Sequence, residues 1–426
     1  MIIQPSMRVL LVNTSERTGG AAIACNRLMN ALKKSNVKAK MLVRDKQSDR
    51  IVVVPIKPSF MLPLKFLWER FVIFLANRLH RKGIFLVDIA NTGTDITTMR
   101  DFQQTDIIHL HWTNQGFLSM SDIRKIIKSD KPVVITMHDM WYFTGICHYA
   151  SSCQKYKTQC EHCELLADGK SPFDLARRVF NKKKQIYSLA PITFVGCSKW
   201  ITDLARQSAL TQGHTIVSIP NPIDMNIFHP IDKLEIRRKL GFDADRKIIL
   251  FGAQRITDER KGFHYLAEAC NLIKKNNPTL AANITIIVVG GDSTRIQNQI
   301  PFTIKSVSYI KQEEQMVELY NAADIYVTPS LQDNLPNTIV EAMACGIPCV
   351  GFNVGGIPEM IDHKQNGYVA EFKNAADFAQ GIEWTLSNDY SALSAAAHQK
   401  AVDTYSETTV ANKFKEIYDN ACNGNI

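Results

Sequence analysis

The stretch from residue 333 to residue 360 constrains the fold of this chain more than any other. An apolar run at 325–329 precedes it and predicts a buried strand. Residues 338–345 predict a short helix that ends just before Gly346, where a left-handed backbone costs least. Residues 349–352 return to strand. A strand–loop–helix–strand unit of this kind indicates a parallel α/β sheet.

Two acidic residues flank the start of this helix, Asp333 in the loop and Glu341 about two turns further on. A helix start offers free backbone N–H groups and a positive end, which together bind an anion such as a diphosphate. Ionised carboxylates only accept hydrogen bonds, so two of them suit hydroxyl-rich ligands such as ribose and hexose. An ordinary α/β crossover with solvated acidic side chains explains the acid pair alone equally well.

The combined pattern, DNLPNTIVEAMACGIPCVGFNVGGIPEM, resembles the donor-site signature of retaining family-4 glycosyltransferases of the GT-B fold. The resemblance implies that Glu341 holds the donor ribose and that Asp333 touches the transferred sugar. The family normally has Glu at the first position, and Asp333 is one methylene shorter. Asn334, Leu335 and Asn337, which lie between the two acids, are expected at the same donor site.

Two cations follow a predicted strand at 248–252. Arg255 comes just after the strand, and Lys261 with Gly262 leads into a helix. Such a pair forms an anion clamp, although surface charge explains either cation alone. The resemblance implies that Arg255 and Lys261 contact the donor diphosphate and stabilise its charge as it leaves. It therefore implies no metal or other cofactor for catalysis.

The first half of the chain opens with a strand at 8–13, after which Gly19 and Gly20 begin a helix that runs to about Lys34. A glycine pair at a strand-to-helix turn lets a ligand approach the backbone closely. Many α/β proteins have such a pair as a plain turn. The resemblance adds that this loop faces the cleft between the two domains, where it is expected to meet the donor.

Histidines mark the ends of two further predicted strands. His109 and His111 lie in the strand at 106–112, and His138 follows the strand within 132–141. Ligands of doubly wound sheets bind beyond the carboxyl ends of the strands. Metal ligands, acid or base groups and structural residues all remain open for these histidines. The resemblance favours His138 as a residue of the active site, with His109 and His111 second.

Ten cysteines in a chain without a visible secretory signal indicate reduced thiols and a cytosolic protein. Four of them fall within the segment 147–163, namely Cys147, Cys153, Cys160 and Cys163. Cys160 and Cys163 have the spacing of a zinc knuckle, whereas the other spacings are irregular. A structural zinc site and unligated thiols both remain possible.

The segment 57–86 predicts an amphipathic helix. Its apolar face carries Leu64, Leu67, Trp68, Phe71, Val72, Phe74, Leu75 and Leu79. Charges at Glu69, Arg70 and Arg78 interrupt the apolar run of about 20 residues that a membrane-spanning helix needs. A basic helix with Trp and Phe suits a membrane interface, and the alternative is a core helix with a solvated outer face.

Charge favours the membrane interpretation of this helix. Residues 1–222 carry 31 Lys and Arg against 16 Asp and Glu, a net +15, while residues 223–426 carry 19 against 25, a net −6. A basic half beside an acidic half indicates an anionic partner for the first half. The candidates are an acidic membrane, a phosphate-bearing acceptor and nucleic acid. We expect an anionic membrane surface, which makes the protein peripheral at the cytoplasmic face.

Strands alternate with helices on both sides of a proline-rich linker at 219–224. This pattern predicts an α/β protein of two Rossmann-like, doubly wound domains that face a cleft, as in the GT-B fold. We expect an acceptor-side domain at 1–222 and a nucleotide-sugar domain at 223–407. The last helix, 408–426, is expected to cross back to the first domain.

The expected function is that of a retaining glycosyltransferase. It would move a hexose or N-acetylhexosamine from a nucleotide sugar to a hydroxyl of a glycan. The resemblance implies a glycan carried by a polyprenyl diphosphate, in the biosynthesis of a bacterial surface polysaccharide. A GT-B sugar-nucleotide epimerase is the alternative. A non-enzymatic nucleic-acid-binding protein ranks below both, because no nucleic-acid module is recognised.

Overall fold

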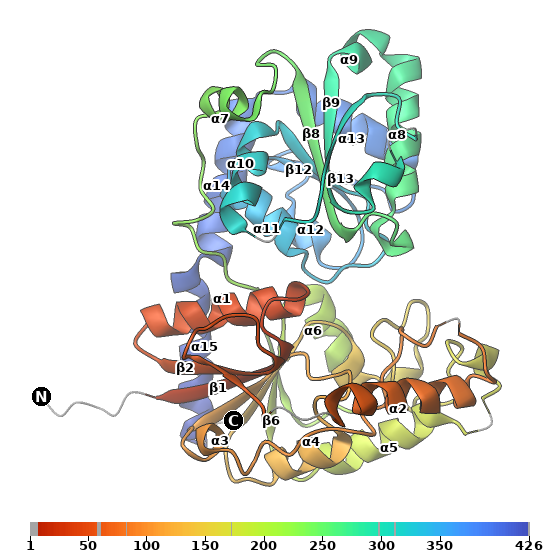
Figure 1. The fold of residues 1–426 in the computed structure, drawn as a ribbon, viewed down its shortest axis with the longest axis vertical. Helices are drawn as coiled ribbons and strands as arrows, with labels where there is room; N and C mark the ends of the chain where they lie inside the picture. Colours follow the sequence, from red (N-terminus) through yellow and green to blue (C-terminus); the bar gives the residue numbers. More distant parts are fainter. Residues whose placement is uncertain are drawn as a thin grey trace, which may run out of the picture. The chain divides into compact units, whose positions relative to one another are not determined.

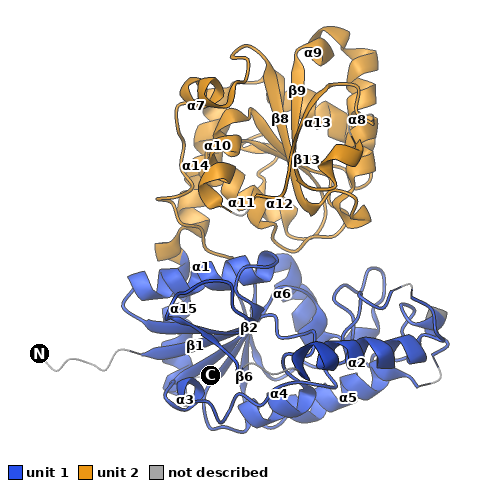
Figure 2. Cartoon of the chain, in the orientation of Figure 1, with its two compact units in different colours: residues 1–220, 410–426 blue, residues 221–409 orange. Residues whose placement is uncertain are grey.

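The computed structural model describes residues 7–57, 61–81, 83–171, 173–296, 299–310 and 312–424. The predicted segments 1–222, 57–86, 223–407 and 408–426 each include a few positions outside these ranges. The chain divides into two compact units (Figure 2). Unit 1 comprises residues 1–220 and 410–426, and unit 2 comprises residues 221–409.

Unit 1 contains a seven-stranded sheet in the order β3-β2-β1-β4-β5-β6-β7, and all neighbouring strands are parallel. Its strands are β1 (Arg8–Ser15), β2 (Lys38–Asp45), β3 (Val53–Pro55), β4 (Ile107–Leu110), β5 (Val133–Met137), β6 (Ile192–Gly196) and β7 (Thr215–Ser218). The strand order reverses between β1 and β4. A doubly wound sheet places its ligands beyond the strand ends at this point.

Helices cover both faces of this sheet (Figure 1). They are α1 (Gly20–Lys34), α2 (Met61–Ala76), α3 (Arg100–Gln103), α4 (Met120–Ile127), α5 (Leu175–Tyr187), α6 (Lys199–Arg206) and most of α15 (Glu407–Cys422), with the short helices η1 (Trp141–Phe143), η2 (Lys155–Lys157) and η3 (Ala167–Gly169). Leu10 and Val12 of β1 belong to one buried cluster, while Val9 and Leu11 belong to another. Successive side chains of a strand point to opposite faces, so β1 is buried on both.

Unit 2 repeats the architecture with a six-stranded parallel sheet in the order β10-β9-β8-β11-β12-β13. Its strands are β8 (Lys247–Arg255), β9 (Ile284–Gly291), β10 (Thr303–Val307), β11 (Ile325–Thr328), β12 (Cys349–Phe352) and β13 (Gly367–Ala370). Its helices are α7 (Lys233–Leu240), α8 (Phe263–Asn276), α9 (Pro278–Ala282), α10 (Glu313–Ala322), α11 (Asn337–Ala344), α12 (Ile357–Met360), α13 (Ala375–Ser387) and α14 (Tyr390–Tyr405), with η4 (Glu259–Lys261) and η5 (Ser293–Ile296).

The local predictions at the two glycine-bearing turns are confirmed. Helix α11 spans Asn337–Ala344, and Gly346 follows it in the left-handed region with φ of 73°. Helix α1 begins at Gly20, and the residue before it, Gly19, has φ of 92°. Both positions need a residue that tolerates positive φ, which is why the sequence carries glycine there.

Helix α2 packs on unit 1 through the buried Ile73 and Ala76, but not through the apolar face that its periodicity predicts. Its polar side chains point into unit 1, where Glu69 is fully buried and Arg70 is 7% exposed. The predicted apolar face lies outside instead: Trp68 is 55% exposed and Phe71 is 47% exposed. Hydrogen bonds attach this helix to unit 1, because Glu69 Oε1 accepts hydrogen bonds from the backbone N–H groups of Ile89 and Ala90.

The length and hydropathy of the helices bear on the membrane question. Within the described ranges, none combines enough length and apolar character to cross a bilayer.

Candidate active site

In unit 2, Lys261 and Asp333 form an ion pair. Lys261 is the last residue of η4, and its Nζ donates to Asp333 Oδ2 at 2.7 Å with both side chains partly exposed. Gly262 follows with φ of 65°, and a Cβ there would lie 1.9 Å from the carbonyl oxygen of Pro329. Only glycine allows this approach, so the turn holds Lys261 against the loop that follows β11.

The loop around Asp333 is also held from its other side. A Cβ on Gly355 would lie 1.7 Å from the carbonyl oxygen of Asp333, and the Gly356 N–H donates to the carbonyl of Asn334 at 2.9 Å. Asn334 and Leu335 are buried in this loop. The structure therefore brings together Asp333, Asn334 and Lys261, which the sequence predicted for one donor site, and rigid backbone contacts position them.

Glu341 lies in the second turn of α11 and is 7% exposed. Its Oε2 accepts a hydrogen bond from Tyr320 Oη of α10 at 2.8 Å. Burial raises the pKa of Tyr320 well above its ordinary value, so its hydroxyl keeps its proton and remains a donor. At the start of the same helix, Asn337 Oδ1 accepts from Asn221 Nδ2 at 3.1 Å.

Arg255 is the last residue of β8, and its side chain is exposed. The pairing of β8 with β9 shifts register between Gly252 and Arg255, a bulge that redirects the strand end. Among the described residues, no side-chain hydrogen bond or ion pair links Arg255 to the Lys261–Asp333 pair. A guanidinium can bind an anion through two parallel hydrogen bonds.

In unit 1, the structure assigns His109 a structural role. The Nδ1 of His109 lies 2.7 Å from Tyr418 Oη, and Nε2 lies 2.7 Å from Thr136 Oγ1. Burial, with a smaller contribution from His138, lowers the pKa of His109 to about 3. A neutral imidazole with both nitrogens engaged in the core has no capacity left for a ligand.

His111 and His138 form a pair at the ends of β4 and β5. His111 Nδ1 lies 2.9 Å from His138 Nε2, and their rings stack at 5.2 Å. On the other side of the ring, His138 Nδ1 lies 3.4 Å from Cys197 Sγ. Burial lowers the pKa of His138 to about 4, so this half-buried ring is neutral at physiological pH. Since both ring nitrogens already have partners, His138 would have to exchange one of these contacts to orient a ligand by hydrogen bonding, and it carries no positive charge.

Gly19 and Gly20 occupy the turn between β1 and α1. A Cβ at Gly19 would have nothing within 4 Å, so its positive φ, rather than crowding, explains the glycine. The end of β1 also contacts the loop after β4, because the Thr14 N–H donates to the carbonyl of Trp112 at 2.8 Å. The turn thus lies at the strand ends of β1 and β4, where the sheet order reverses.

The four clustered cysteines all belong to the buried core of unit 1 or pack against it. Burial raises the pKa of the Cys160 thiol to about 11, and burial raises that of Cys147 as well. Within the described residues, one group of three potential metal ligands has its ligand atoms within 4.8 Å of one another. It consists of Glu161, His162 and Asp174, whose side chains are partly to fully exposed. The zinc site at the four thiols remains a prediction.

We expect protein purified without chelator to carry about one equivalent of zinc if the four thiols are ligands. Elemental analysis of the native protein and of a Cys160→Ser, Cys163→Ser variant measures this. Loss of zinc from the variant alone assigns it to these thiols. Less than about a tenth of an equivalent in the native protein would exclude a structural zinc site.

Two parallel α/β sheets, each with helices on both faces, and a charged strand-end site in unit 2 define a protein of the GT-B fold, as the sequence predicted. Residues 232–403 match the family model described as "Glycosyl transferases group 1". An uncharacterized glycosyltransferase of Haemophilus influenzae is 30% identical over 199 residues, which covers 45% of this chain and 52% of that protein.

Solved structures match the fold over nearly the whole chain. Sucrose-phosphate synthase from Thermosynechococcus elongatus aligns with a TM-score of 0.68 at 17% identity, covering 98% of this chain and 100% of that one. Anabaena HepE in complex with UDP-glucose aligns with a TM-score of 0.61 at 16% identity, covering 97% and 99%. The chain spans about half the length of the first curated relative. These matches give no support to the epimerase alternative.

Sequence reasoning missed the contact of Tyr320 with Glu341 and the contact of His148 with Asp88. Tyr320 lies 21 residues before Glu341, and Asp88 lies 60 residues before its partner His148. A buried Tyr in a helix is usually a core residue, and a lone Asp in a loop is usually solvated. No local spacing distinguishes these three residues from such cases.

Proposed function

We propose that this protein is a retaining glycosyltransferase that moves a hexose or N-acetylhexosamine from a nucleotide sugar to a hydroxyl of a glycan. The observation that carries the proposal is the Lys261–Asp333 ion pair beside α11, within the residues that match group 1 glycosyl transferases. The structural match to HepE bound to UDP-glucose supports a nucleotide-sugar donor. Retention and the choice of sugar rest on the family resemblance.

Negative charge grows on the diphosphate as it leaves the sugar. Lys261 supplies a compact positive charge at the helix-flanked loop, and the exposed Arg255 can fork across two phosphate oxygens. Stabilisation of developing charge by such fixed cations is usually the largest electrostatic contribution to catalysis. These side chains would serve the purpose that a metal ion serves in other transferases, so we propose no catalytic cofactor.

The acidic residues of the site would bind the sugars of the donor. Asp333 Oδ2 accepts a hydrogen bond from Lys261, so the other carboxylate oxygen can accept hydrogen bonds from hydroxyls of the transferred sugar. Glu341 would accept hydrogen bonds from the ribose hydroxyls, and the hydrogen bond from Tyr320 would fix the orientation of its carboxylate. In unit 1, the neutral His138 would orient the reacting sugar or the acceptor by hydrogen bonding.

We also propose that the acceptor glycan is carried by a polyprenyl diphosphate at the cytoplasmic face of a bacterial membrane, in surface polysaccharide biosynthesis. Helix α2 supports this, because its outer face exposes Leu64, Leu67, Trp68, Phe71 and Leu75. Such a face is suited to the interface between headgroups and acyl chains. The excess of basic residues in 1–222 would attract anionic lipids.

Release of nucleoside diphosphate tests the proposal. A transferase releases free nucleoside diphosphate from a nucleotide sugar when glycan acceptor is added. For a retaining enzyme, NMR of the product should show the same anomeric configuration as in the donor. An epimerase would instead change the sugar while it stays attached to the nucleotide. Binding of nucleic acid without diphosphate release would favour the remaining alternative, in which the basic half of the chain binds nucleic acid.

We expect Glu341→Gln to weaken nucleotide-sugar affinity by roughly 10- to 100-fold, since a hydrogen bond to a charged group contributes about 1.5–3 kcal/mol. Turnover at saturating donor should change much less, because a ribose contact is equal in the ground state and the transition state. Calorimetry and steady-state kinetics measure the two effects. Glu383→Gln, on α13 of the same unit, serves as the matched control. A large fall in turnover at unchanged affinity would show that Glu341 does not bind the ribose.

A further inference from the structure

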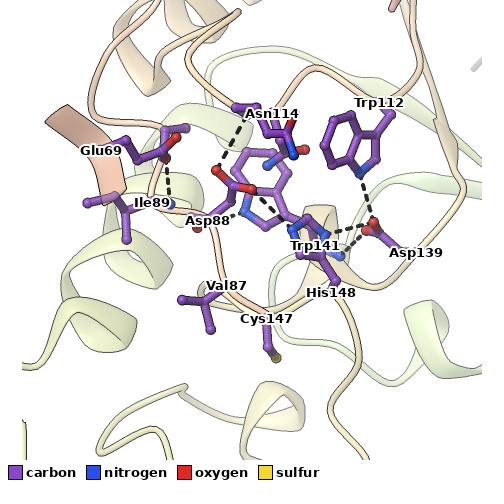
Figure 3. Close-up of polar contacts among 12 residues, drawn as sticks. Glu69, Val87, Asp88, Ile89, Trp112, Asn114, Asp139, Trp141, Cys147 and His148 are labelled. Carbon is purple, nitrogen blue, oxygen red and sulfur yellow. Dashed lines mark hydrogen bonds and ion pairs between the residues drawn. The ribbon is translucent and has the colours of Figure 1, made fainter. Parts of the chain in front are cut away.

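A charged array lies in unit 1 around His148 (Figure 3). His148 Nδ1 lies 2.7 Å from Asp139 Oδ2, and its Nε2 lies 3.2 Å from Asp88 Oδ2. Burial alone would lower the pKa of His148, but the two carboxylates outweigh it and raise the pKa to about 10. His148 is therefore an imidazolium held between two carboxylates, and both of its N–H groups donate.

The two carboxylates also hold the loop that follows β4. Asp139 Oδ2 accepts from Trp112 Nε1 at 2.9 Å, and Asp88 Oδ1 lies 3.5 Å from the Gln115 N–H. The Trp112 ring lies 5.8 Å from the His148 ring at an angle of 31°. Trp112 is only half-buried, so part of its indole ring is exposed and can contact a ligand.

The charges of this array balance. Arg70 of α2 donates to Asp88 Oδ1 at 2.7 Å, so two carboxylates face one guanidinium and one imidazolium. Burial raises the pKa of the neighbouring Glu69 to about 8, with Asp88 adding to the effect, so that Glu69 is mostly protonated at neutral pH. An array without excess positive charge does not favour a phosphate, and it suits a neutral ligand.

The loop also has hydrogen-bonding capacity that the described part of the protein does not use. Asn114 is 1% exposed, and both its Oδ1 and its Nδ2 lack a partner there. His111, the residue immediately before Trp112, likewise has Nε2 buried without a partner among the described residues. Buried amides are normally satisfied, so an unmet donor and acceptor point to a ligand rich in hydroxyls.

We infer that Trp112 and Asn114 form a subsite for a neutral sugar ring of the acceptor, and that the Asp139–His148–Asp88 array positions Trp112. The inference rests on the proposed function, because it deepens the acceptor side of that reaction. The C–H face of a pyranose can lie on the indole ring, and its hydroxyls can reach polar groups of the loop. The subsite is adjacent to His111, which contacts His138.

Saturation-transfer NMR with purified protein tests the subsite directly. The probes are glucose, galactose, mannose, N-acetylglucosamine and inorganic diphosphate. We expect at least one sugar to bind the native protein and to lose about tenfold or more in affinity in Trp112→Leu, given what aromatic stacking contributes. Phe173→Leu, an exposed aromatic of the same unit, is the control and should bind as the native protein does.

A positioning role for His148 has its own signature. His148→Gln should weaken sugar binding less than Trp112→Leu does. Because His148 acts through Trp112, the effects of His148→Gln and Trp112→Leu on sugar affinity should not be additive when the two are combined. A residue needed only for folding would instead lower the thermal unfolding temperature and leave the two effects additive.

Three outcomes would overturn the inference: no sugar binds in a Trp112-dependent way, diphosphate binds there instead, or Phe173→Leu loses as much as Trp112→Leu. Nucleotide binding to unit 2, measured on the same samples, separates this failure from that of the proposed function. If UDP-glucose binding depends on Lys261 but sugar binding does not depend on Trp112, the proposed subsite is wrong and the transferase proposal stands.

Discussion

Lys261→Ala should lower turnover by roughly 100- to 1000-fold, which is the effect of removing one comparable electrostatic donor, about 2.7–4 kcal/mol. The charge on the diphosphate grows during the reaction, so the loss should fall on turnover more than on ground-state binding. We expect nucleotide-sugar affinity to stay within about tenfold. Steady-state turnover and calorimetric affinity for the nucleotide sugar measure the two quantities.

Lys275→Ala is the matched control for this prediction, because Lys275 is an exposed lysine on α8 of the same unit. The ion pair adds a second test. Since Lys261 and Asp333 lie 2.7 Å apart, Asp333→Asn and Lys261→Ala should not be additive when combined. Near-normal turnover of Lys261→Ala would mean that the pair is surface charge, and the donor site in unit 2 would have to be withdrawn.

Replacing Trp68, Phe71 and Leu75 by Ser should release the protein from anionic vesicles, with partitioning reduced by roughly 100-fold or more. Each large apolar side chain contributes about 1.5–3 kcal/mol when it is fully buried, and we expect partial insertion of all three. The three side chains are 42–55% exposed on α2, so serine there should leave folding intact. Sedimentation with phosphatidylglycerol vesicles measures the release, and nucleotide affinity should not change.

Ile51→Ser provides the control, because Ile51 is 91% exposed on the same unit but lies outside α2. If the triple variant sediments with vesicles as the native protein does, α2 is not the anchor. If the native protein does not bind vesicles at all, the exposed face of α2 has another partner, and the membrane-linked acceptor would have to be reconsidered.

Local sequence rules predicted the loop and helix that follow β11 in unit 2 well. Pro336 precedes α11 and Gly346 follows it, so the helix bounds could be predicted from capping chemistry alone. Lys261 and Asp333 were both predicted at the site, although 72 positions separate them. The family pattern supplied that link. Their direct ion pair could not be predicted, since it depends on how closely Gly262 lets two loops approach.

The orientation of α2 was a different kind of problem. Its helical periodicity correctly separated apolar from polar side chains, but periodicity does not say which face is buried. Ordinary burial preferences place Glu69 and Arg70 outside. They are inside because Asp88, two backbone N–H groups and two carbonyls, of Ile84 and Val87, bind most of their polar atoms there. Glu69 Oε2 and Arg70 Nε are buried without a hydrogen-bond partner among the described residues.

The sequence by itself therefore determined the elements whose signals are local: alternating strands and helices, glycine turns with positive φ, and the helix caps, which together give two doubly wound sheets. Only the tertiary structure decided which polar groups meet. His148 with Asp88 and Asp139, and Glu341 with Tyr320, are joined across 9 to 60 residues. The physical reason is that a backbone preference depends on near neighbours, whereas a buried charge is stable only where the whole fold supplies its partners.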